Sequence, residues 1–115
     1  MHVIFSGSPT GLEYIELRSR SVALRWEQLN TAERCNPPIL YSVKVTVVAG
    51  QQQQQQGLCN AQQLMEFNTT NTHAIITGLC PYSRYEISIK ACTEHGDVCG
   101  SYSSSLSVRT LEDGM

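Results

Sequence analysis

Five cysteines are the residues of this 115-residue chain best suited to chemistry, and that number is high for its length. Cys92 and Cys99 flank His95 in the order Cys-x-x-His-x-x-x-Cys, and Cys35 would supply a fourth ligand of the kind that zinc prefers. The spacing is not that of a common zinc motif, and disulfide formation explains the cysteines more simply. We therefore expect no metal and no cofactor.

The cysteine usage also bears on the compartment of the protein. Disulfides persist in secreted and cell-surface proteins, whereas cytosolic thiols stay reduced. Five cysteines in so short a chain fit an oxidising compartment better than the cytosol. The alternative is a cytosolic domain with several buried free thiols, because free cysteine packs well in cores.

Other reactive constellations are missing from the sequence. No serine stands in a Gly-x-Ser-x-Gly context, no paired carboxylates share a strand face, and no glycine-rich phosphate loop is present. The formal net charge of −2 provides no basic excess for nucleic acid. No apolar run approaches the ~20 residues that span a bilayer. We expect neither an enzyme nor a domain that binds nucleic acid or touches a membrane.

The elements that must position these residues are short segments of alternating polarity. Val22, Leu24 and Trp26 alternate with outward residues, and the same period of two marks the later segments. A break in that period between Tyr14 and Leu17 indicates a bulge or kink. Six glutamines at positions 51–56 indicate a flexible loop tip. Strands are expected at residues 12–17, 21–26, 39–47, 58–67, 72–76, 85–91 and 103–110.

The segment at residues 79–91 is the most diagnostic. Leu79, Pro81 and Tyr85 describe a turn that enters a strand with a buried tyrosine, and alternating apolar residues follow that tyrosine. The tyrosine is placed like a tyrosine corner, in which the hydroxyl bonds back to upstream backbone. An immunoglobulin domain would carry a cysteine two residues later, where this chain has Ile87.

With Trp26 near the front, these residues resemble the fibronectin type III family. The matching residues are Pro9, Leu12, Ser21, Val22, Leu24, Trp26, Pro38, Tyr41, Val43, Gly78, Leu79, Pro81, Tyr85, Ala91, Gly96 and Thr110. The resemblance implies an all-β, seven-stranded, immunoglobulin-like Greek-key sandwich with sheets A-B-E and C-C′-F-G. It covers residues 9–111, so residues 1–8 and 112–115 are interpreted as flanks of a module from a larger protein.

The strand positions that the resemblance implies also suggest disulfides. Cys92 would end strand F and Cys99 open strand G, and neighbouring antiparallel strands bring such residues close enough for a bridge. Cys59 and Cys80, at the opposite end of the sandwich, form a second candidate pair. Cys35 would be left over, or would compete for Cys92 or Cys99.

Three surface features are candidate interaction sites. Asn68-Thr69-Thr70 is an N-glycosylation acceptor, expected in a loop before the fifth strand. Arg18, Arg20 and Arg25 cluster near the first hairpin, but exposed arginines on a strand usually form a solvated face, which disfavours heparan sulfate. The loop at residues 95–97 reads His-Gly-Asp, without the arginine of an integrin-binding Arg-Gly-Asp.

The resemblance implies a non-catalytic module that spaces domains and binds proteins in an extracellular or cell-surface receptor, adhesion or matrix protein. The binding loops would be BC, with Arg34, Cys35 and Asn36, and FG, with Glu94, His95, Asp97 and Val98. The alternatives are an intracellular scaffold or muscle-type module with reduced thiols, and an accessory module of an enzyme chain such as a receptor phosphatase or kinase.

Overall fold

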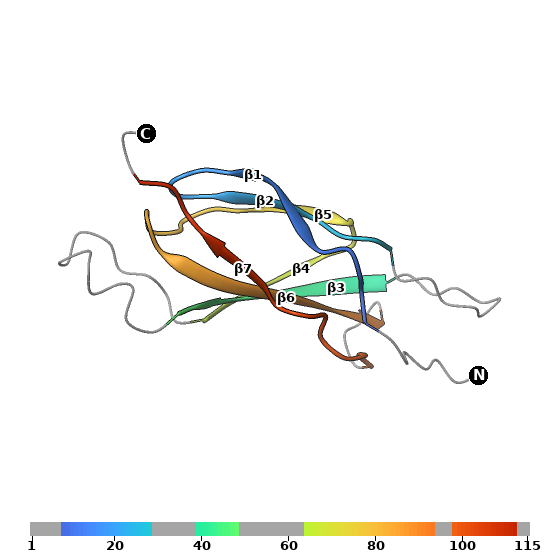
Figure 1. Cartoon of the computed structure of the whole chain (residues 1–115). Coiled ribbons are helices and arrows are strands. Elements are labelled where there is room, and N and C mark those ends of the chain that lie inside the picture. Colours follow the sequence, from blue (N-terminus) through green and yellow to red (C-terminus); the bar gives the residue numbers. More distant parts are fainter. Residues whose placement is uncertain (1–7, 29–38, 49–63, 94–97, 113–115) are drawn as a thin grey trace, which may run out of the picture.

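The computed structural model of the chain describes residues 8–28, 39–48, 64–93 and 98–112. Within these ranges it contains seven strands and no helix (Figure 1). The strands are β1 (Glu13–Leu17), β2 (Val22–Arg25), β3 (Ile39–Val47), β4 (Leu64–Thr69), β5 (His73–Ile76), β6 (Arg84–Thr93) and β7 (Leu106–Arg109).

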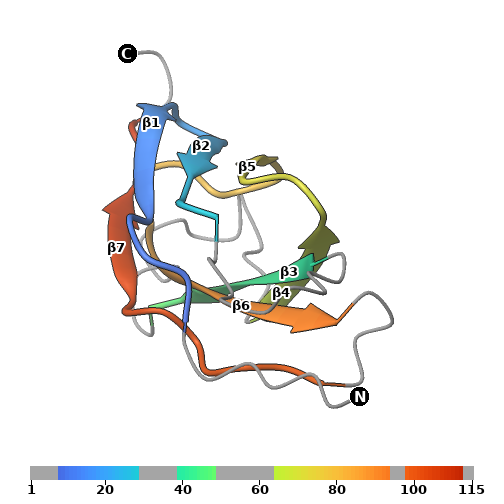
Figure 2. The ribbon, with the colours of Figure 1, turned by 90° about the vertical axis from the view of Figure 1, so that its right-hand side faces the viewer.

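Two antiparallel sheets form the two layers of a sandwich, which Figure 2 shows from a second direction. One sheet has the order β1-β2-β5 and the other the order β4-β3-β6-β7. These correspond to the expected sheets A-B-E and C-C′-F-G, so the all-β, seven-stranded Greek-key sandwich predicted from the sequence is confirmed.

Alternation along the two longest strands builds the core. Tyr41, Val43 and Val45 of β3 are buried, and so are Ile87 and Ile89 of β6, because their side chains face the opposite sheet. The opposite sheet contributes Val22, Leu24 and Ile76. Trp26 closes one end of the core and meets Tyr41 edge to face, with ring centroids 5.6 Å apart.

Strand β1 departs from regular pairing at the place predicted. Tyr14 pairs with Leu24 and Glu16 pairs with Ala23, so β1 advances two residues where β2 advances one. Ile15 is therefore the extra residue of a β-bulge. The bulge explains why the apolar period of this segment breaks in the sequence.

The tyrosine corner ties together the end of the sandwich where the chain enters β6. Tyr85 is buried, and its hydroxyl oxygen accepts a hydrogen bond from the Cys80 N–H at 2.8 Å. Thr110, also buried, donates its hydroxyl to the Cys80 carbonyl at 2.6 Å and accepts from the Ser83 N–H at 2.9 Å. Buried backbone groups of the turn are thus satisfied by the side chains of Tyr85 in β6 and of Thr110, which follows β7 directly.

Candidate functional site

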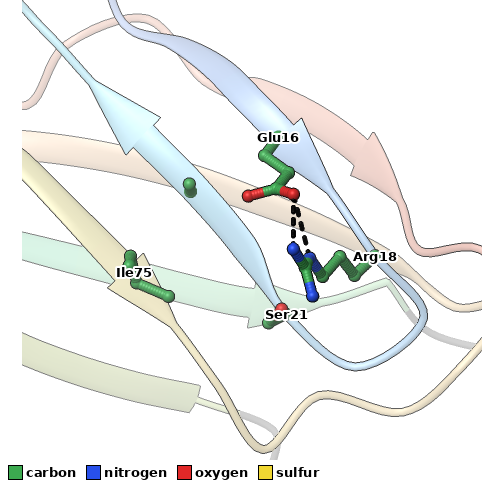
Figure 3. Close-up of a pocket in the computed structure, with 5 residues that line it drawn as sticks. Glu16, Arg18, Ser21 and Ile75 are labelled. Atoms are coloured by element: carbon green, nitrogen blue, oxygen red, sulfur yellow. Dashed lines mark hydrogen bonds and ion pairs between the residues drawn. The ribbon is translucent and has the colours of Figure 1, made fainter.

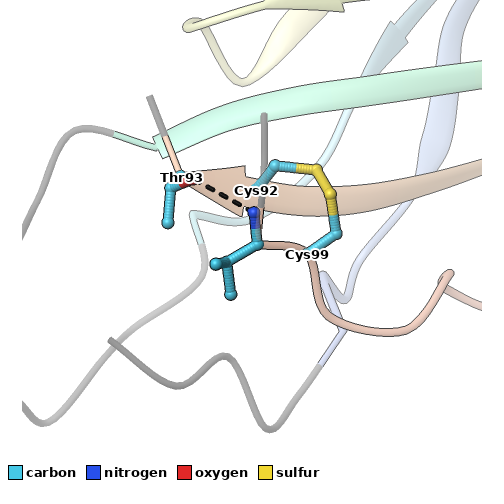
Figure 4. Close-up of a disulfide and its surroundings, with 4 residues drawn as sticks. Cys92, Thr93 and Cys99 are labelled. Atoms are coloured by element: carbon cyan, nitrogen blue, oxygen red, sulfur yellow. Dashed lines mark hydrogen bonds between the residues drawn. A yellow bond between two sulfur atoms is a disulfide. The ribbon is translucent and has the colours of Figure 1, made fainter. Parts of the chain in front are cut away.

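The Cys92–Cys99 disulfide fixes the end of the sandwich opposite the tyrosine corner (Figure 4). Its Cα atoms lie 4.0 Å apart, and the two residues form an isolated antiparallel bridge beyond β7. Two backbone hydrogen bonds flank the pair, one on each side: Thr93 N–H to Val98 O (2.8 Å) and Gly100 N–H to Ala91 O (2.9 Å). Cys92 and Cys99 therefore form a non-hydrogen-bonded pair, where facing side chains come closest. The bridge predicted for this junction is present.

The disulfide also bears on zinc binding by Cys92 and Cys99. Because the Cys92 and Cys99 sulfur atoms are bonded to each other, they are not available as thiolate ligands for zinc. Cys80 is disulfide-bonded too. Cys59, the partner predicted for Cys80, and Cys35 lie outside the described residues, so the Cys59–Cys80 pairing stays a prediction.

The candidate binding loops are described only at their edge. Arg34, Cys35 and Asn36 of the BC loop, and Glu94, His95 and Asp97 of the FG loop, lie outside the described residues. Val98 is described, and it is 41% exposed beside the disulfide. Its N–H donates to the Thr93 hydroxyl at 3.3 Å, so the side of the FG loop that returns to the sheet is held against β6.

The chain after the disulfide returns along β6 with extra length. From Ile87 to Cys92, β6 advances five residues, whereas the facing chain from Leu106 back to Cys99 takes seven. Two additional residues are therefore accommodated along residues 100–105. Ser103 still donates its N–H to a β6 carbonyl at 2.7 Å. The last strand was predicted at residues 103–110 and is shorter in the structure because these extra residues interrupt regular pairing.

Tyr102 in this irregular segment lies beside two lysines of the four-stranded sheet. The Lys44 Nζ is 4.2 Å from the centre of the Tyr102 ring, and the Lys90 Nζ is 4.9 Å from it. In the sheet, Ser42 pairs with Lys90 and Lys44 pairs with Ser88, and both serines are buried. We conclude that the ring and the lysine stems cover this part of the outer face. This cluster was not predicted, because the two extra residues have no signature in the sequence.

Tyr82 is a second feature that was not predicted from the sequence. Its φ is +49°, a left-handed conformation that is strained for a bulky residue. The exposed ring contacts Arg109, whose guanidinium carbon lies 4.9 Å from the ring centre and whose Nη1 donates to the Tyr82 hydroxyl at 3.3 Å. The Tyr82 N–H donates to the Leu111 carbonyl at 2.9 Å. This turn therefore holds an aromatic side chain where glycine would be free of strain.

The outer face of the three-stranded sheet carries a shallow hollow of about 250 Å³ (Figure 3). Glu16, Arg18, Ser21, Ala23 and Ile75 line it. Arg18 donates two hydrogen bonds to one Glu16 oxygen, at 2.7 and 3.0 Å.

Two of the three arginines considered for heparan sulfate lie on this side of the molecule. Arg18 is ion-paired with Glu16, and Arg25 is ion-paired with Glu13. These partners leave neither arginine as a surplus positive charge.

Asn68 does not lie in a loop, as expected from the sequence, but in strand β4, where it pairs with Ser42 of β3. Strand β4 was predicted to end at Phe67 and continues to Thr69. The position remains exposed, since β4 is the edge strand of its sheet. The Thr69 hydroxyl of the acceptor motif accepts a hydrogen bond from the Asn71 N–H at 3.1 Å.

The two-layer sandwich, its corner tyrosine and its core tryptophan define an immunoglobulin-like module of the fibronectin type. A family model of the fibronectin type III domain matches residues 7–109. The chain therefore belongs to the fibronectin type III family.

Known proteins similar to this chain include a receptor-type phosphatase and two fibronectin-type domains of solved structure. Human receptor-type tyrosine-protein phosphatase F is 31% identical over 106 residues, which are 92% of this chain and 5% of the phosphatase. The FN5 domain of Drosophila Lar is 21% identical, with a TM-score of 0.64, over 93% of this chain and 98% of that domain. The third fibronectin III domain of human KIAA0343 protein is 16% identical, with a TM-score of 0.71, over 97% and 87% of the two chains.

Proposed function

We propose that this chain is a non-catalytic spacer and protein-interaction module on the extracellular side of a multidomain receptor, adhesion or matrix protein. The observation that carries the proposal is the Cys92–Cys99 disulfide between the strands that flank the FG loop. Such bonds persist in oxidising compartments and are rare in the cytosol. The similarity to a receptor-type phosphatase supports the same location.

The binding surface is the pair of loops at the disulfide-bonded end, BC with residues 34–36 and FG with residues 94–98. Hydrogen bonds on both sides of the disulfide hold the base of the FG loop against β6. A loop on a rigid base loses less conformational entropy when it binds a partner. The exposed Val98 at this base would give such a partner an apolar contact.

Two modifications belong to this proposal. Asn68 is exposed on an edge strand and carries an N-linked glycan when the protein passes through the secretory pathway. Cys59 and Cys80 form the second disulfide, and the bonded state of Cys80 supports it.

A second candidate rests on the similarity to the receptor-type phosphatase: the parent chain carries an enzyme domain elsewhere, and this module lies in its receptor part. The chain spans 5% of the length of that phosphatase. This alternative concerns the parent protein and leaves the role of the module unchanged.

Antibody labelling of the full-length parent protein in intact cells tests the location. With an antibody against this module, we expect labelling of non-permeabilised cells or recovery from the medium. Labelling that requires permeabilisation would contradict the extracellular proposal and favour the intracellular scaffold.

Loop replacement tests the proposed surface. Glycine-serine replacements of residues 34–36 and 94–98 should abolish binding of partners found in a panel of secreted ectodomains. The control variant Ile75→Ser changes an exposed residue on the other sheet and should leave binding intact. A partner that still binds after both loop replacements would refute this surface.

A further inference from the structure

The four edges of the two sheets differ in how well they resist pairing with another strand. Strand β1 has a bulge at Ile15 and carries two glutamates. Strands β5 and β7 are four residues long, and β7 ends at Arg109. Bulges, charges and short length are the features by which proteins protect sheet edges.

Strand β4 lacks these features. It has six residues, it pairs with β3 without a register shift, and its only charged residue is Glu66. Leu64 is 54% exposed and Phe67 is 39% exposed on this strand. Among the described strands, β4 is therefore the edge best suited to accept another β-strand.

We propose that β4 pairs with β4 of a second copy of this chain, antiparallel, about a two-fold axis at Phe67. The two four-stranded sheets would then form one continuous sheet across the dimer. This proposal goes beyond the module's proposed function and concerns the chain without a glycan on Asn68.

The alternation of side chains restricts the register. In a continuous sheet, facing residues must point to the same side, so a two-fold axis perpendicular to the sheet lies midway between one residue and its own copy. An axis at Glu66 places the two Glu66 carboxylates opposite each other, which is unfavourable. An axis at Phe67 pairs the two Phe67 rings, and it places Glu66 opposite Asn68 and Met65 opposite Thr69.

The Phe67 register is therefore free of like-charge contacts and gives the dimer an aromatic pair at its centre. Phe67 faces the core side of the sheet, opposite Val43, yet it remains partly exposed because it lies at the sheet edge. Pairing would cover this apolar surface in both copies, which makes a second copy a suitable occupant.

The position of Asn68 makes this pairing sensitive to glycosylation. Asn68 is next to Phe67, and the second strand would lie only about 4.8 Å away. A glycan at Asn68, which is part of the proposed function, would obstruct that strand. The unglycosylated protein is thus the form that dimerises.

Sedimentation equilibrium of unglycosylated protein, from about 1 μM to about 1 mM, tests the proposal over the range expected for a small interface. We expect the apparent mass to rise toward twice that of the monomer. Phe67→Glu should remain monomeric throughout. The control Ile75→Glu adds the same charge at a residue that is 70% exposed on the other sheet, and it should dimerise like the wild type.

Amide hydrogen exchange of the wild type, measured at the lowest and the highest of these protein concentrations, tests the β4 pairing even if Phe67→Glu fails to fold. The β4 amides that point away from β3 should become protected at high concentration, whereas those of β7 should not change. A wild type that stays monomeric, or a dimer without new protection in β4, would overturn the proposal. If the unglycosylated protein dimerises, Asn68-glycosylated protein that dimerises as readily as the unglycosylated protein would overturn the inference that the glycan prevents pairing.

Discussion

The tyrosine corner provides the sharpest test of how this fold is stabilised. Tyr85→Phe removes one oxygen atom and leaves the ring, which is buried against both sheets. The Cys80 N–H, whose hydrogen bond to that oxygen is 2.8 Å long, then loses its acceptor. Cys80 is itself buried, so water does not replace the lost acceptor without structural change.

The expected cost follows from these two facts. An unsatisfied buried backbone donor costs about 1–3 kcal/mol, and relief from burying the hydroxyl offsets part of that loss. We expect the free energy of unfolding to fall by about 2 kcal/mol. With a urea m-value of about 1–1.5 kcal/mol/M for a small domain, the midpoint should fall by about 1–2 M.

Urea unfolding with the disulfides intact measures this change. Tyr14→Phe is the matched control, since Tyr14 is 47% exposed and its free energy change should stay under about 0.5 kcal/mol. If Tyr85→Phe shifts the urea midpoint no more than Tyr14→Phe does, the corner hydrogen bond does not stabilise the fold.

The disulfide, the Tyr102 ring, the turn at Tyr82 and the Tyr85 hydroxyl each affect the stability of the fold in a measurable way. Replacing Cys92 and Cys99 with alanine opens a short loop and should lower the free energy of unfolding by about 2–3 kcal/mol; an unchanged urea midpoint would contradict this. Tyr102→Ala should cost about 1 kcal/mol, whereas Tyr102→Phe, which keeps the ring between the two lysines, should cost almost nothing in the same assay. Tyr82→Gly should be more stable than Tyr82→Ala by about 1 kcal/mol, because only glycine relieves the positive φ; equal midpoints would refute the strain. Burial raises the pKa of Tyr85 above its usual value of 10.0, although the hydrogen bond from Cys80 lowers it in part. The folded state therefore holds the Tyr85 hydroxyl proton more tightly than the unfolded state does. The stability that this proton contributes is complete below the unfolded pKa of Tyr85, and it is lost as the pH rises through the folded pKa. Stability measured from pH 9 upward should therefore fall less steeply in Tyr85→Phe than in the wild type.

The fold was predictable because its central strands face the core on one side only. Along β3 and β6 the apolar period of two runs unbroken from Tyr41 to Val47 and from Tyr85 to Ala91, and each of these apolar residues is buried. The break in β1 was visible for the same reason, since a bulge shifts the period by one residue.

The edges of the four-stranded sheet were harder to predict. Strand β4 lies at the edge of its sheet, and its inward-facing residues are partly exposed, so apolar residues alternate only weakly along it. Asn68 was therefore predicted to lie in a loop. The extra residues before β7 are polar and leave no break in a pattern. Backbone strain at Tyr82 depends on the turn that the whole fold imposes and has no local signature.

Of the predicted site, the disulfide between Cys92 and Cys99 followed from the order of strands, which a family resemblance supplies. The loop residues chosen for partner binding stay predictions, apart from the exposure of Val98. Loop function depends on a partner's shape and charge, and the sequence of the module alone contains neither.

The central claim, a disulfide-bonded module of the extracellular space, is tested most directly by peptide mapping without reduction, on the parent protein isolated from its own cells with free thiols blocked. We predict a linked peptide pair containing Cys92 and Cys99, a second pair containing Cys80, and a single blocked thiol. Five blocked thiols in folded protein would contradict it.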